Sequence, residues 1–472
     1  MYVKNEKYKR LFRFFGMIWI ALFQTSVFWV VWDRFYNSAI DQSFAHRGNW
    51  LIVGLYLLIL LLFTQVYGGF KIGYEKPGNL ALSQSIAVLG TNVVEFLIIV
   101  LLSRQTYLET GHLINPTWLI VMSVTQILGI TLFAWAFTKI YYALFPARKL
   151  LMIYGDYPES AQILVAKMNH LKEKYQIAEM VNQDLGLEEL KKKVLEYQGV
   201  VLLDVNVDVR NRLVKYCYGT VTRVYVVPNI SDIILSSAEN IHFFDTPLLL
   251  ARNSGLTIEQ KLAKRIMDLV ISGIGIIMAS PFMLLTAIAI KLYDGGPVFF
   301  RQDRATIGGK VFSITKFRSM IVDAEKAGHS IPATDRDPRI TPVGHFIRAT
   351  RLDELPQLFD IFRGDMSIVG PRPERVEHVE KYTKEIPEFA YRLKVKGGLT
   401  GYAQIYGKYN TSAIDKLKLD LMYIENYSVL LDIKLILMTV KIMFMKESTE
   451  GFTAEKSEAM HDAGQEKKQN EQ

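Results

Sequence analysis

The chain has 472 residues, a hydrophobic share of 50% and a formal net charge of +8. A mean hydropathy of +0.15 is high for a soluble protein, and the single Cys217 excludes an internal disulfide, which suits a reducing cytosolic face. Because the sequence has neither zinc-finger spacing nor a nucleic-acid-binding motif, we attribute the positive charge to attraction for anionic lipid and phosphate substrates and expect no nucleic-acid partner.

Four apolar stretches occupy the first third of the chain, at residues 11–31, 50–67, 83–102 and 118–143. Each approaches the ~20 residues that a helix needs to cross a membrane, so we predict a four-helix transmembrane domain over residues 1–148. Lysine and arginine gather before the first stretch, in the second loop and after the fourth stretch. The positive-inside rule then places the N-terminus, the second loop and everything after residue 143 in the cytoplasm. Glu95, inside the third stretch, is interpreted as a buried carboxyl that is partnered or protonated.

Residues 149–250 have the pattern of a small cytosolic α/β domain. Apolar runs and helical spacing predict three strands and one helix, at 150–154, 200–205, 223–227 and 161–171. Alternation of strands and helices favours a parallel, Rossmann-like sheet. The first strand is followed by Gly155 alone rather than by G-x-G-x-x-G, so we predict no dinucleotide site and expect a role in interaction or regulation.

A fifth apolar stretch, residues 269–290, is long enough to cross a membrane but has Ser280-Pro281 at its middle, where proline breaks or kinks a helix. Basic residues on both sides suit two ends on the same membrane face. A full crossing would also place the arginine-rich region that follows outside the cell, away from nucleotide-activated substrates. We therefore predict a re-entrant helix that turns at Ser280-Pro281; a proline-kinked full crossing is the alternative.

Two strand-like runs, at 298–307 and 310–320, flank Gly308-Gly309 and predict a β-hairpin. In the second run Lys316 and Arg318 are two residues apart and share a face, so both are candidates for binding one phosphate. A solvent-facing edge strand whose charges prevent edge-to-edge pairing explains the same pattern nearly as well.

The adjacent acids Asp353 and Glu354 are the most informative feature of the chain. They stand among four guanidiniums, those of Arg348, Arg351, Arg363 and Arg372. A carboxylate can attack phosphorus or hold a divalent cation, and arginine binds phosphate oxygens bidentately. The pattern therefore indicates phosphoryl chemistry, and a solvated, salt-bridged helix face is the alternative.

Local signals around the acid pair predict its backbone. We expect Asp353 to be the N-cap of a helix that has Pro356 in its first turn, which places both carboxylates at a positive helix end. Gly370-Pro-Arg-Pro373 predicts a rigid turn that directs Arg372. Residues 430–445 are apolar but too short to span a membrane, and they predict a helix in the membrane interface, with a core helix as the alternative. The polar tail, 447–472, is predicted to be disordered.

Six stretches, in order over about residues 256–446, resemble the motifs of the bacterial sugar transferase family, which are polyprenyl-phosphate hexose-1-phosphate transferases or phosphoglycosyl transferases. These stretches are residues 295–302, 315–320, 337–344, 351–358, 364–373 and 397–401. The four N-terminal spans and the α/β insert resemble the large members, which start exopolysaccharide or capsule repeat units. Tyr402-Ala-Gln-Ile-Tyr406, where many members have a Trp-Gln pair, departs from the family pattern and bears on sugar preference.

The resemblance implies a ping-pong reaction between a UDP-sugar donor and undecaprenyl phosphate. Asp353 matches the family's nucleophile, which attacks the β-phosphate and releases UMP, and Glu354 matches the partner acid associated with Mg²⁺. Ser280-Pro281 matches the break in the re-entrant helix. A looser match covers residues expected to bind substrate or phosphate, namely Lys316, Arg318, Arg339, Arg351, Asp365 and Arg372. Glucose or galactose is the sugar expected first, with N-acetylated sugars behind.

The fold class expected is a membrane protein with an α-helical N-terminal bundle, a cytosolic α/β domain and an α+β catalytic domain with a re-entrant membrane helix, the last over 256–446. We expect it in the bacterial inner membrane, in contact with membrane lipid, with its catalytic domain cytoplasmic; a homo-oligomer is compatible with this pattern. Two other functions compete. Asp335-Arg-Asp337 is a formal D-x-D, as in metal-dependent glycosyltransferases that release UDP. A non-catalytic assembly scaffold is disfavoured by the intact acid pair.

Overall fold

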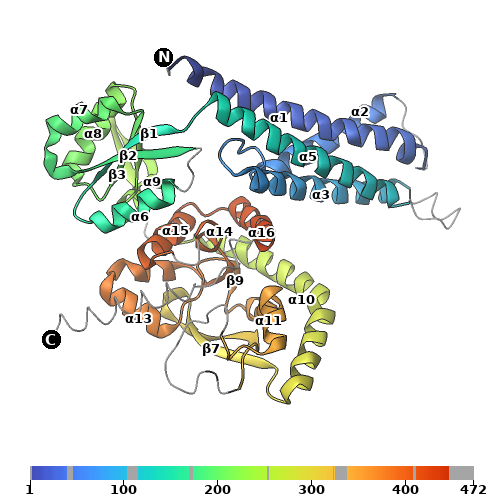
Figure 1. Cartoon of the computed structure of the whole chain (residues 1–472). Helices are drawn as coiled ribbons and strands as arrows, with labels where there is room; N and C mark the ends of the chain where they lie inside the picture. Colours follow the sequence, from blue (N-terminus) through green and yellow to red (C-terminus); the bar gives the residue numbers. More distant parts are fainter. Residues whose placement is uncertain are drawn as a thin grey trace. The chain divides into compact units, whose positions relative to one another are not determined.

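The computed structural model describes residues 3–39, 46–103, 115–169, 174–251, 255–322, 324, 337–407 and 411–445 (Figure 1). The predicted disordered tail, 447–472, and Asp335 of the D-x-D lie outside the described residues. Chain contacts divide the molecule into two compact units, residues 1–228 and 229–472. The fold is mostly helical, and it contains a four-stranded parallel sheet.

Four long helices form the first part of unit one, where the four apolar stretches predicted them. They are α1 (Val3–Val31), α2 (His46–Tyr67), α3 (Pro77–Leu102) and α5 (Thr117–Leu144), each longer than its apolar stretch. Two short turns, η1 (Trp32–Tyr36) and η2 (Asn37–Ala39), follow α1. The four helices share a core that includes Phe28, Tyr56, Leu60 and Ile130. Among the described residues, five helices are long and apolar enough to cross a membrane: these four and α10 (Ile258–Asp294) of unit two. This suggests a membrane protein.

A layer of neutral polar groups crosses this bundle. Tyr56 donates to Asn92 Oδ1 (3.0 Å), Asn92 Nδ2 donates to Gln126 Oε1 (2.8 Å) and Gln126 Nε2 donates to the Tyr56 hydroxyl (2.8 Å). The ring satisfies donors and acceptors that would be costly to leave unpaired in an apolar interior. Glu95 is buried as predicted, and neither of its carboxyl oxygens has a hydrogen-bond partner among the described residues.

A four-stranded parallel sheet follows, in the order β2-β1-β3-β4. Its strands are β1 (Arg148–Tyr154), β2 (Tyr175–Asn182), β3 (Gly199–Leu203) and β4 (Arg223–Val226). Its helices and turn are α6 (Pro158–Asn169), η3 (Gln183–Leu185), α7 (Leu187–Glu196) and α8 (Val207–Gly219). Apolar clusters cover both faces of the sheet, one under α6 and one under α7 and α8. The predicted parallel sheet is confirmed, whereas β2 escaped sequence analysis because polar residues such as Gln176 and Glu179 interrupt its apolar pattern.

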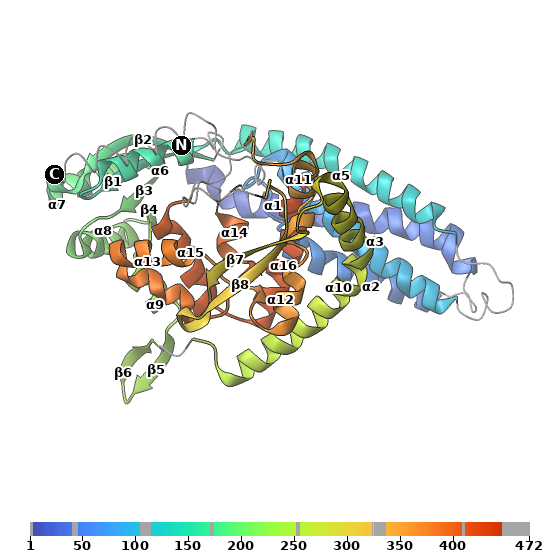
Figure 2. The ribbon, with the colours of Figure 1, turned by 90° about the horizontal axis from the view of Figure 1, so that it is seen from below.

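Unit two begins with α9 (Ile230–Ser236) and an antiparallel hairpin of β5 (Glu239–Phe243) and β6 (Thr246–Leu250). The long helix α10 (Ile258–Asp294) then contains the fifth apolar stretch, with Pro281 inside it. Figures 1 and 2 both show α10 changing direction along its length. Pro281 has no N–H for the carbonyl of Ile277, and the Ser280 hydroxyl donates to that carbonyl instead (2.8 Å). The Ser-Pro pair therefore bends the helix without leaving this acceptor unsatisfied.

The remainder of unit two is built from short elements around one core. The predicted hairpin is confirmed as β7 (Phe299–Ala305) and β8 (Val311–Phe317), joined through η4 (Ile307–Gly309). After it come α11 (Pro342–Ala349), η5 (Leu352–Glu354), α12 (Gln357–Arg363), β9 (Ser367–Val369), α13 (Val376–Glu385), η6 (Pro387–Lys394), β10 (Gly398–Thr400), α14 (Tyr402–Tyr406), α15 (Ala413–Glu425) and α16 (Val429–Met443). Strands β9 and β10 are parallel neighbours. The core joins residues of β8, α12, β9, α15 and α16.

Helix α16 presents two kinds of face. Leu435 and Met438 lie in the core, whereas Leu430 and Met443 are exposed. The two lysines Lys434 and Lys441 of this helix have different surroundings, since Lys441 is buried and Lys434 is exposed. The helix therefore combines a core-facing side with an exposed apolar side.

Candidate active site

The acid pair lies in a short 3-10 turn, η5, and not at the start of the helix that follows. Helix α12 begins at Gln357 after Pro356, so the prediction that Asp353 caps a helix is wrong. The backbone reverses at Arg351, whose φ of 55° and ψ of 19° lie in the left-handed region that non-glycine residues rarely adopt. Such strained conformations are found where the surrounding structure enforces them, as at functional sites. The turn directs both carboxylates toward cationic side chains.

Glu354 is held between two cations. Its Oε1 accepts a hydrogen bond from Lys316 Nζ at 3.1 Å and another from Arg372 Nη2 at 2.7 Å. Burial favours the protonated form of Glu354, but Arg372 and Lys316 outweigh it and lower the pKa of this carboxyl below its usual range. Glu354 is therefore a permanent anion at neutral pH.

Asp353 is in the opposite electrostatic state. Burial, followed by the charge of Glu354, raises the pKa of Asp353, while Lys316, Arg348 and Arg372 oppose that rise. Among the described residues, no side chain or backbone group donates a hydrogen bond to its carboxylate. Asp353 is thus an incompletely solvated carboxylate beside a fixed anion, and such a carboxylate retains its reactivity toward an electrophile.

Lys316 is brought to the acid pair by β8, and β8 is tied to α12. The backbone N–H of Thr315 donates to Asp360 Oδ2 (2.8 Å), and its hydroxyl donates to Asp360 Oδ1 (3.0 Å). Asp360 is fully buried, and burial raises its pKa while these two bonds lower it. Sequence reasoning missed Asp360, although an acid next to Ile361 in the apolar stripe of a helix is a signal of a buried hydrogen-bonding role.

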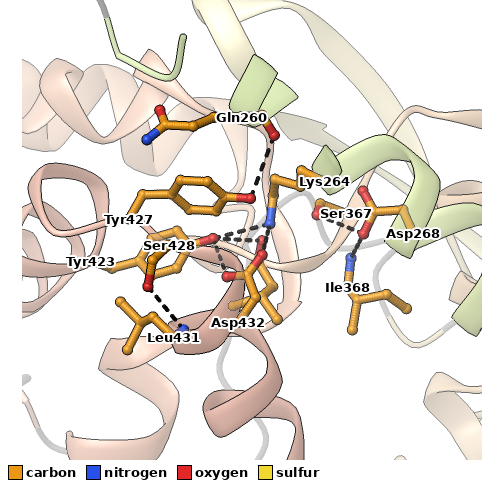
Figure 3. Close-up of polar contacts among 11 residues, drawn as sticks. Gln260, Lys264, Asp268, Ser367, Ile368, Tyr423, Tyr427, Ser428, Leu431 and Asp432 are labelled. Atoms are coloured by element: carbon orange, nitrogen blue, oxygen red, sulfur yellow. Dashed lines mark hydrogen bonds and ion pairs between the residues drawn. The ribbon is translucent and has the colours of Figure 1, made fainter. Parts of the chain in front are cut away.

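Helix α10 supports both α12 and the strand that precedes Arg372. Leu358 of α12 packs so closely on Gly275 of α10 that a Cβ there would lie 3.3 Å from the leucine. Asp268 of α10 accepts hydrogen bonds from the Ser367 hydroxyl and the Ile368 N–H of β9, each at 2.9 Å (Figure 3). One turn earlier, Lys264 binds Asp432 of α16. The helix predicted to lie in the membrane therefore positions the elements that carry the charged cluster.

Arg348 also acts on the cluster, because its charge lowers the pKa of Asp353. It lies at the end of α11, and its Nη1 is buried without a hydrogen-bond partner among the described residues. A buried guanidinium nitrogen in this state carries positive charge that no hydrogen bond from the described residues compensates. The run of residues around the acid pair identified Arg348, while the resemblance did not assign it a role.

The other predicted site residues have partners of their own. The Arg318 guanidinium forms a bidentate pair with Asp294 and donates through Nε to the carbonyl of Pro297 (2.7 Å). Arg339 forms a bidentate pair with Asp337 (2.6 and 2.9 Å), which lowers the pKa of that carboxyl. Asp365 lies 3.6 Å from Arg363 Nη1. The structure therefore brings Lys316, Arg372 and the acid pair together, and it places Arg318, Arg339 and Asp365 in separate ion pairs.

The same cluster is the best candidate for a Mg²⁺ site. No group of three or more His, Cys, Asp or Glu residues suited to a metal is found in the part of the chain that the structure describes. Mg²⁺ does not need one, because it usually binds one or two carboxylates together with water and substrate phosphates. Glu354 offers a carboxylate that is always ionised, and Asp353 stands beside it. The donor set fits a cation that is completed by a phosphate substrate.

Comparisons with known proteins match the part of the chain that carries this cluster. The model of the family described as bacterial sugar transferase matches residues 259–446. The UDP-glucose:undecaprenyl-phosphate glucose-1-phosphate transferase of Klebsiella pneumoniae is 39% identical over 50% of this chain and 52% of its own length. The chain thus spans about half the length of that relative. The UDP-N-acetylgalactosamine-undecaprenyl-phosphate N-acetylgalactosaminephosphotransferase of Aeromonas hydrophila is 44% identical over 38% of this chain and 43% of its own length.

A shorter relative is covered more fully. The UDP-glucose:undecaprenyl-phosphate glucose-1-phosphate transferase of Caulobacter vibrioides is 40% identical over 38% of this chain and 68% of its own length. The six motifs lie in the region that the family model matches, and this relative is covered over more than two thirds of its own length. On these grounds the chain belongs to the bacterial sugar transferase family.

Proposed function

We propose that the protein transfers a hexose-1-phosphate from a UDP-sugar to undecaprenyl phosphate and releases UMP. The observation that carries the proposal is the pairing of an under-solvated Asp353 with a permanently ionised Glu354, next to the cations Lys316 and Arg372. The names of the relatives, which describe sugar-phosphate transfer to undecaprenyl phosphate, support the same reaction. As the first membrane step of exopolysaccharide or capsule synthesis, it attaches the first sugar to the lipid carrier.

The reaction has two displacements at one phosphorus. A carboxylate oxygen of Asp353 attacks the β-phosphorus of the UDP-sugar, and the bond from that phosphorus to the bridging oxygen breaks, so that UMP departs with the bridging oxygen. The sugar phosphate is then held as an acyl phosphate on Asp353. An oxygen of undecaprenyl phosphate attacks the same phosphorus and regenerates the free carboxylate. The product is an undecaprenyl diphosphate sugar, and no co-reactant is needed.

Charge neutralisation is the main requirement, since an anionic nucleophile must approach an anionic diphosphate. Lys316, Arg348 and Arg372 surround the acid pair and supply three positive charges. Glu354, with Asp353 beside it, would hold Mg²⁺. When bound, the ion would supply positive charge that offsets the charge of the phosphate oxygens. Glu354 orients Lys316 and Arg372 by accepting a hydrogen bond from each.

The lipid acceptor requires the site to lie at the membrane surface. We propose that α10 enters the bilayer from the cytoplasmic side, turns at Ser280-Pro281 and leaves on the same side. Exposed apolar residues of α10 support its contact with lipid, among them Ile277, Met278, Phe282 and Leu285. Phe359 and Phe362 of α12 and the exposed side of α16 add apolar surface that suits the headgroup region. The lipid phosphate then reaches Asp353 without leaving the interface.

The test is a transfer assay with purified full-length protein, Mg²⁺ and undecaprenyl phosphate, supplied in turn with UDP-glucose, UDP-galactose and their N-acetylated forms. We expect UMP as the nucleotide product, with UDP-glucose or UDP-galactose as the best donor. Release of UDP instead of UMP would contradict the proposed reaction. Cysteine labelling at both ends of α10 tests the re-entrant topology, and labelling from opposite sides of the membrane would contradict it.

A further inference from the structure

The turn that carries Arg372 is fixed by its carbonyl groups. Pro371 and Pro373 have no backbone N–H, so this segment lacks half of its usual donors. Four successive carbonyls instead accept hydrogen bonds from the rest of unit two: Gly398 N to Pro371 O (2.9 Å), Arg392 Nη2 to Arg372 O (3.0 Å), Arg304 Nη1 to Pro373 O (3.2 Å) and Ala305 N to Glu374 O (3.0 Å). The backbone beneath the Arg372 side chain is therefore held at each residue.

Arg392 is the contact that reaches Arg372 itself. Its side chain is 3% exposed, and its Nε and Nη2 lie 3.0 and 2.8 Å from Asp420 Oδ2 of α15. Burial raises the pKa of Asp420, and the charge of Arg392 opposes that rise. The third nitrogen, Nη1, lies 3.8 Å from Glu374, on the far side of Pro373 from Arg372. One planar guanidinium thus joins α15 to both ends of the Arg-Pro-Glu segment, a task that requires its fixed fork of donors.

We propose that Arg392, oriented by Asp420, is a positioning residue that holds Arg372 in place to bind Glu354 during phosphoryl transfer. The expected effect on kcat rests on the proposed function. The contact by which Arg392 holds Arg372 does not depend on which reaction the protein catalyses. Arg392 contacts the Arg372 carbonyl, not the acid pair, so it acts on the reaction only through Arg372.

A purely structural role for Arg392 makes different predictions. If the buried Arg392–Asp420 pair only stabilises the fold, a variant that keeps the charge pair should be fully active. Lysine keeps the charge, but its single ammonium cannot bind Asp420 and the Arg372 carbonyl with the geometry of a guanidinium. The Arg392→Lys variant therefore separates the ion pair from the carbonyl contact.

The decisive experiment is a double-mutant cycle of Arg392→Met and Arg372→Ala, with UMP release as the measurement. We expect Arg392→Met alone to lower kcat by about tenfold or more, and to change kcat by less than about twofold in the Arg372→Ala background, because both changes remove the same interaction. Arg392→Lys should keep a melting temperature near that of the wild type and still lose kcat. The inference would be overturned if the losses in kcat of the two single variants multiplied in the double variant. Full activity of Arg392→Lys would overturn it as well.

Arg265→Met is the matched control. Its guanidinium also donates to two backbone carbonyls, those of Ile361 (2.9 Å) and Phe362 (2.8 Å), but these lie at the end of α12 and not in the Arg372 turn. Its effect on kcat should multiply with that of Arg372→Ala, since the two residues share no contact. If Arg265→Met also had almost no effect in the Arg372→Ala background, the result for Arg392→Met would reflect a general loss of structure. That outcome would overturn the inference.

A second measurement needs no turnover. The Arg372 side chain is 43% exposed, so phenylglyoxal can modify it, and mass spectrometry can follow the rate at this residue. We expect faster modification of Arg372 in Arg392→Met and Arg392→Lys than in the wild type or Arg265→Met. An unchanged rate would overturn the positioning role. If the wild type releases no UMP from any UDP-sugar, the proposed function fails, and the labelling rates still decide the inference.

Discussion

Two charged clusters in unit two differ in how completely their atoms are paired. In the Lys264 cluster, Lys264 Nζ lies 2.6 Å from Asp432 Oδ2 and 3.0 Å from the Tyr423 hydroxyl, and that hydroxyl lies 2.8 Å from Asp432 Oδ1 (Figure 3). All three residues are at most 5% exposed. In the cluster around the acid pair, Glu354 Oε1 accepts two hydrogen bonds, while the Asp353 carboxylate accepts none from the described residues.

The difference separates structural charges from charges that are available to a substrate. A buried charge must be compensated, and in the Lys264 cluster the compensation is entirely internal. Around the acid pair, three cations face two carboxylates, and one buried nitrogen of Arg348 has no partner in the described part of the chain. The positive charge around the acid pair and the Asp353 carboxylate are therefore not fully compensated by the described residues, and this incomplete pairing distinguishes the candidate site from the Lys264 cluster.

The largest expected effect is on activity, at the unpaired acid. Asp353→Asn replaces the carboxylate proposed as the nucleophile with an amide, and kcat/KM for UMP release should fall by roughly 10³-fold or more. The melting temperature should stay equal or rise, because burial and Glu354 make the ionised Asp353 unfavourable in the folded protein. A radiolabelled donor should form an acid-anhydride adduct with the wild type and none with the variant. Turnover retained by Asp353→Asn would place the nucleophile elsewhere.

The next largest effect is on stability, in the Lys264 cluster, whose charged atoms are paired with one another. Lys264→Met leaves Asp432 buried without its cation, so the free energy of unfolding should fall by about 3–5 kcal/mol. The double variant Lys264→Met/Asp432→Leu should recover much of this loss, because it removes both charges. Chemical denaturation of the detergent-solubilised protein measures both values. A double variant that is less stable than Lys264→Met would contradict this account of the cluster.

Local patterns in the sequence were enough to predict several parts of this structure. The four N-terminal helices followed from apolar length, the β7–β8 hairpin from Gly308-Gly309, and the candidate chemistry from the adjacency of Asp353 and Glu354. Each of these signals lies within one element or one turn. The N-cap prediction failed because a separate 3-10 turn begins after the left-handed Arg351, and no composition signal marked that conformation.

Contacts between distant residues were not predictable in the same way. Thr315 and Asp360 are 45 residues apart, and Arg392 and Asp420 are 28 apart, so helical or strand spacing says nothing about either pair. Arg318 is a second case in which spacing along a strand did not predict the partner. Its position two residues after Lys316 made a shared phosphate one of two interpretations, but Asp294, 24 residues earlier, binds its guanidinium. Periodicity gives the face of an element, and only the tertiary fold gives the partner on that face.

A smaller effect is expected on the pH dependence of the reaction. Asp353 must be ionised to attack, and Arg348 is one of the charges that lower its pKa. Arg348→Met should therefore raise the pKa of Asp353 further, and the acid limb of the kcat/KM profile should move to higher pH. Lys264→Met removes a cation that is not among the charges acting on Asp353, so it should leave the position of that limb unchanged. A shift to lower pH in Arg348→Met would contradict the assigned electrostatics.

The smallest effect concerns a single hydroxyl in the fully paired cluster. Tyr423→Phe removes the group that bridges Lys264 and Asp432, and the free energy of unfolding should fall by about 1–2 kcal/mol, the loss expected for a buried hydrogen-bonding group whose partners keep each other. Tyr427→Phe is the matched control, because among the described residues its hydroxyl has one long contact, 3.5 Å from the carbonyl of Gln260. Denaturation of both variants should therefore show a smaller loss for Tyr427→Phe. Equal losses would mean that the close pairing of the Lys264 cluster contributes no more to stability than an ordinary buried phenol, and the contrast between the two clusters would then rest on the acid pair alone.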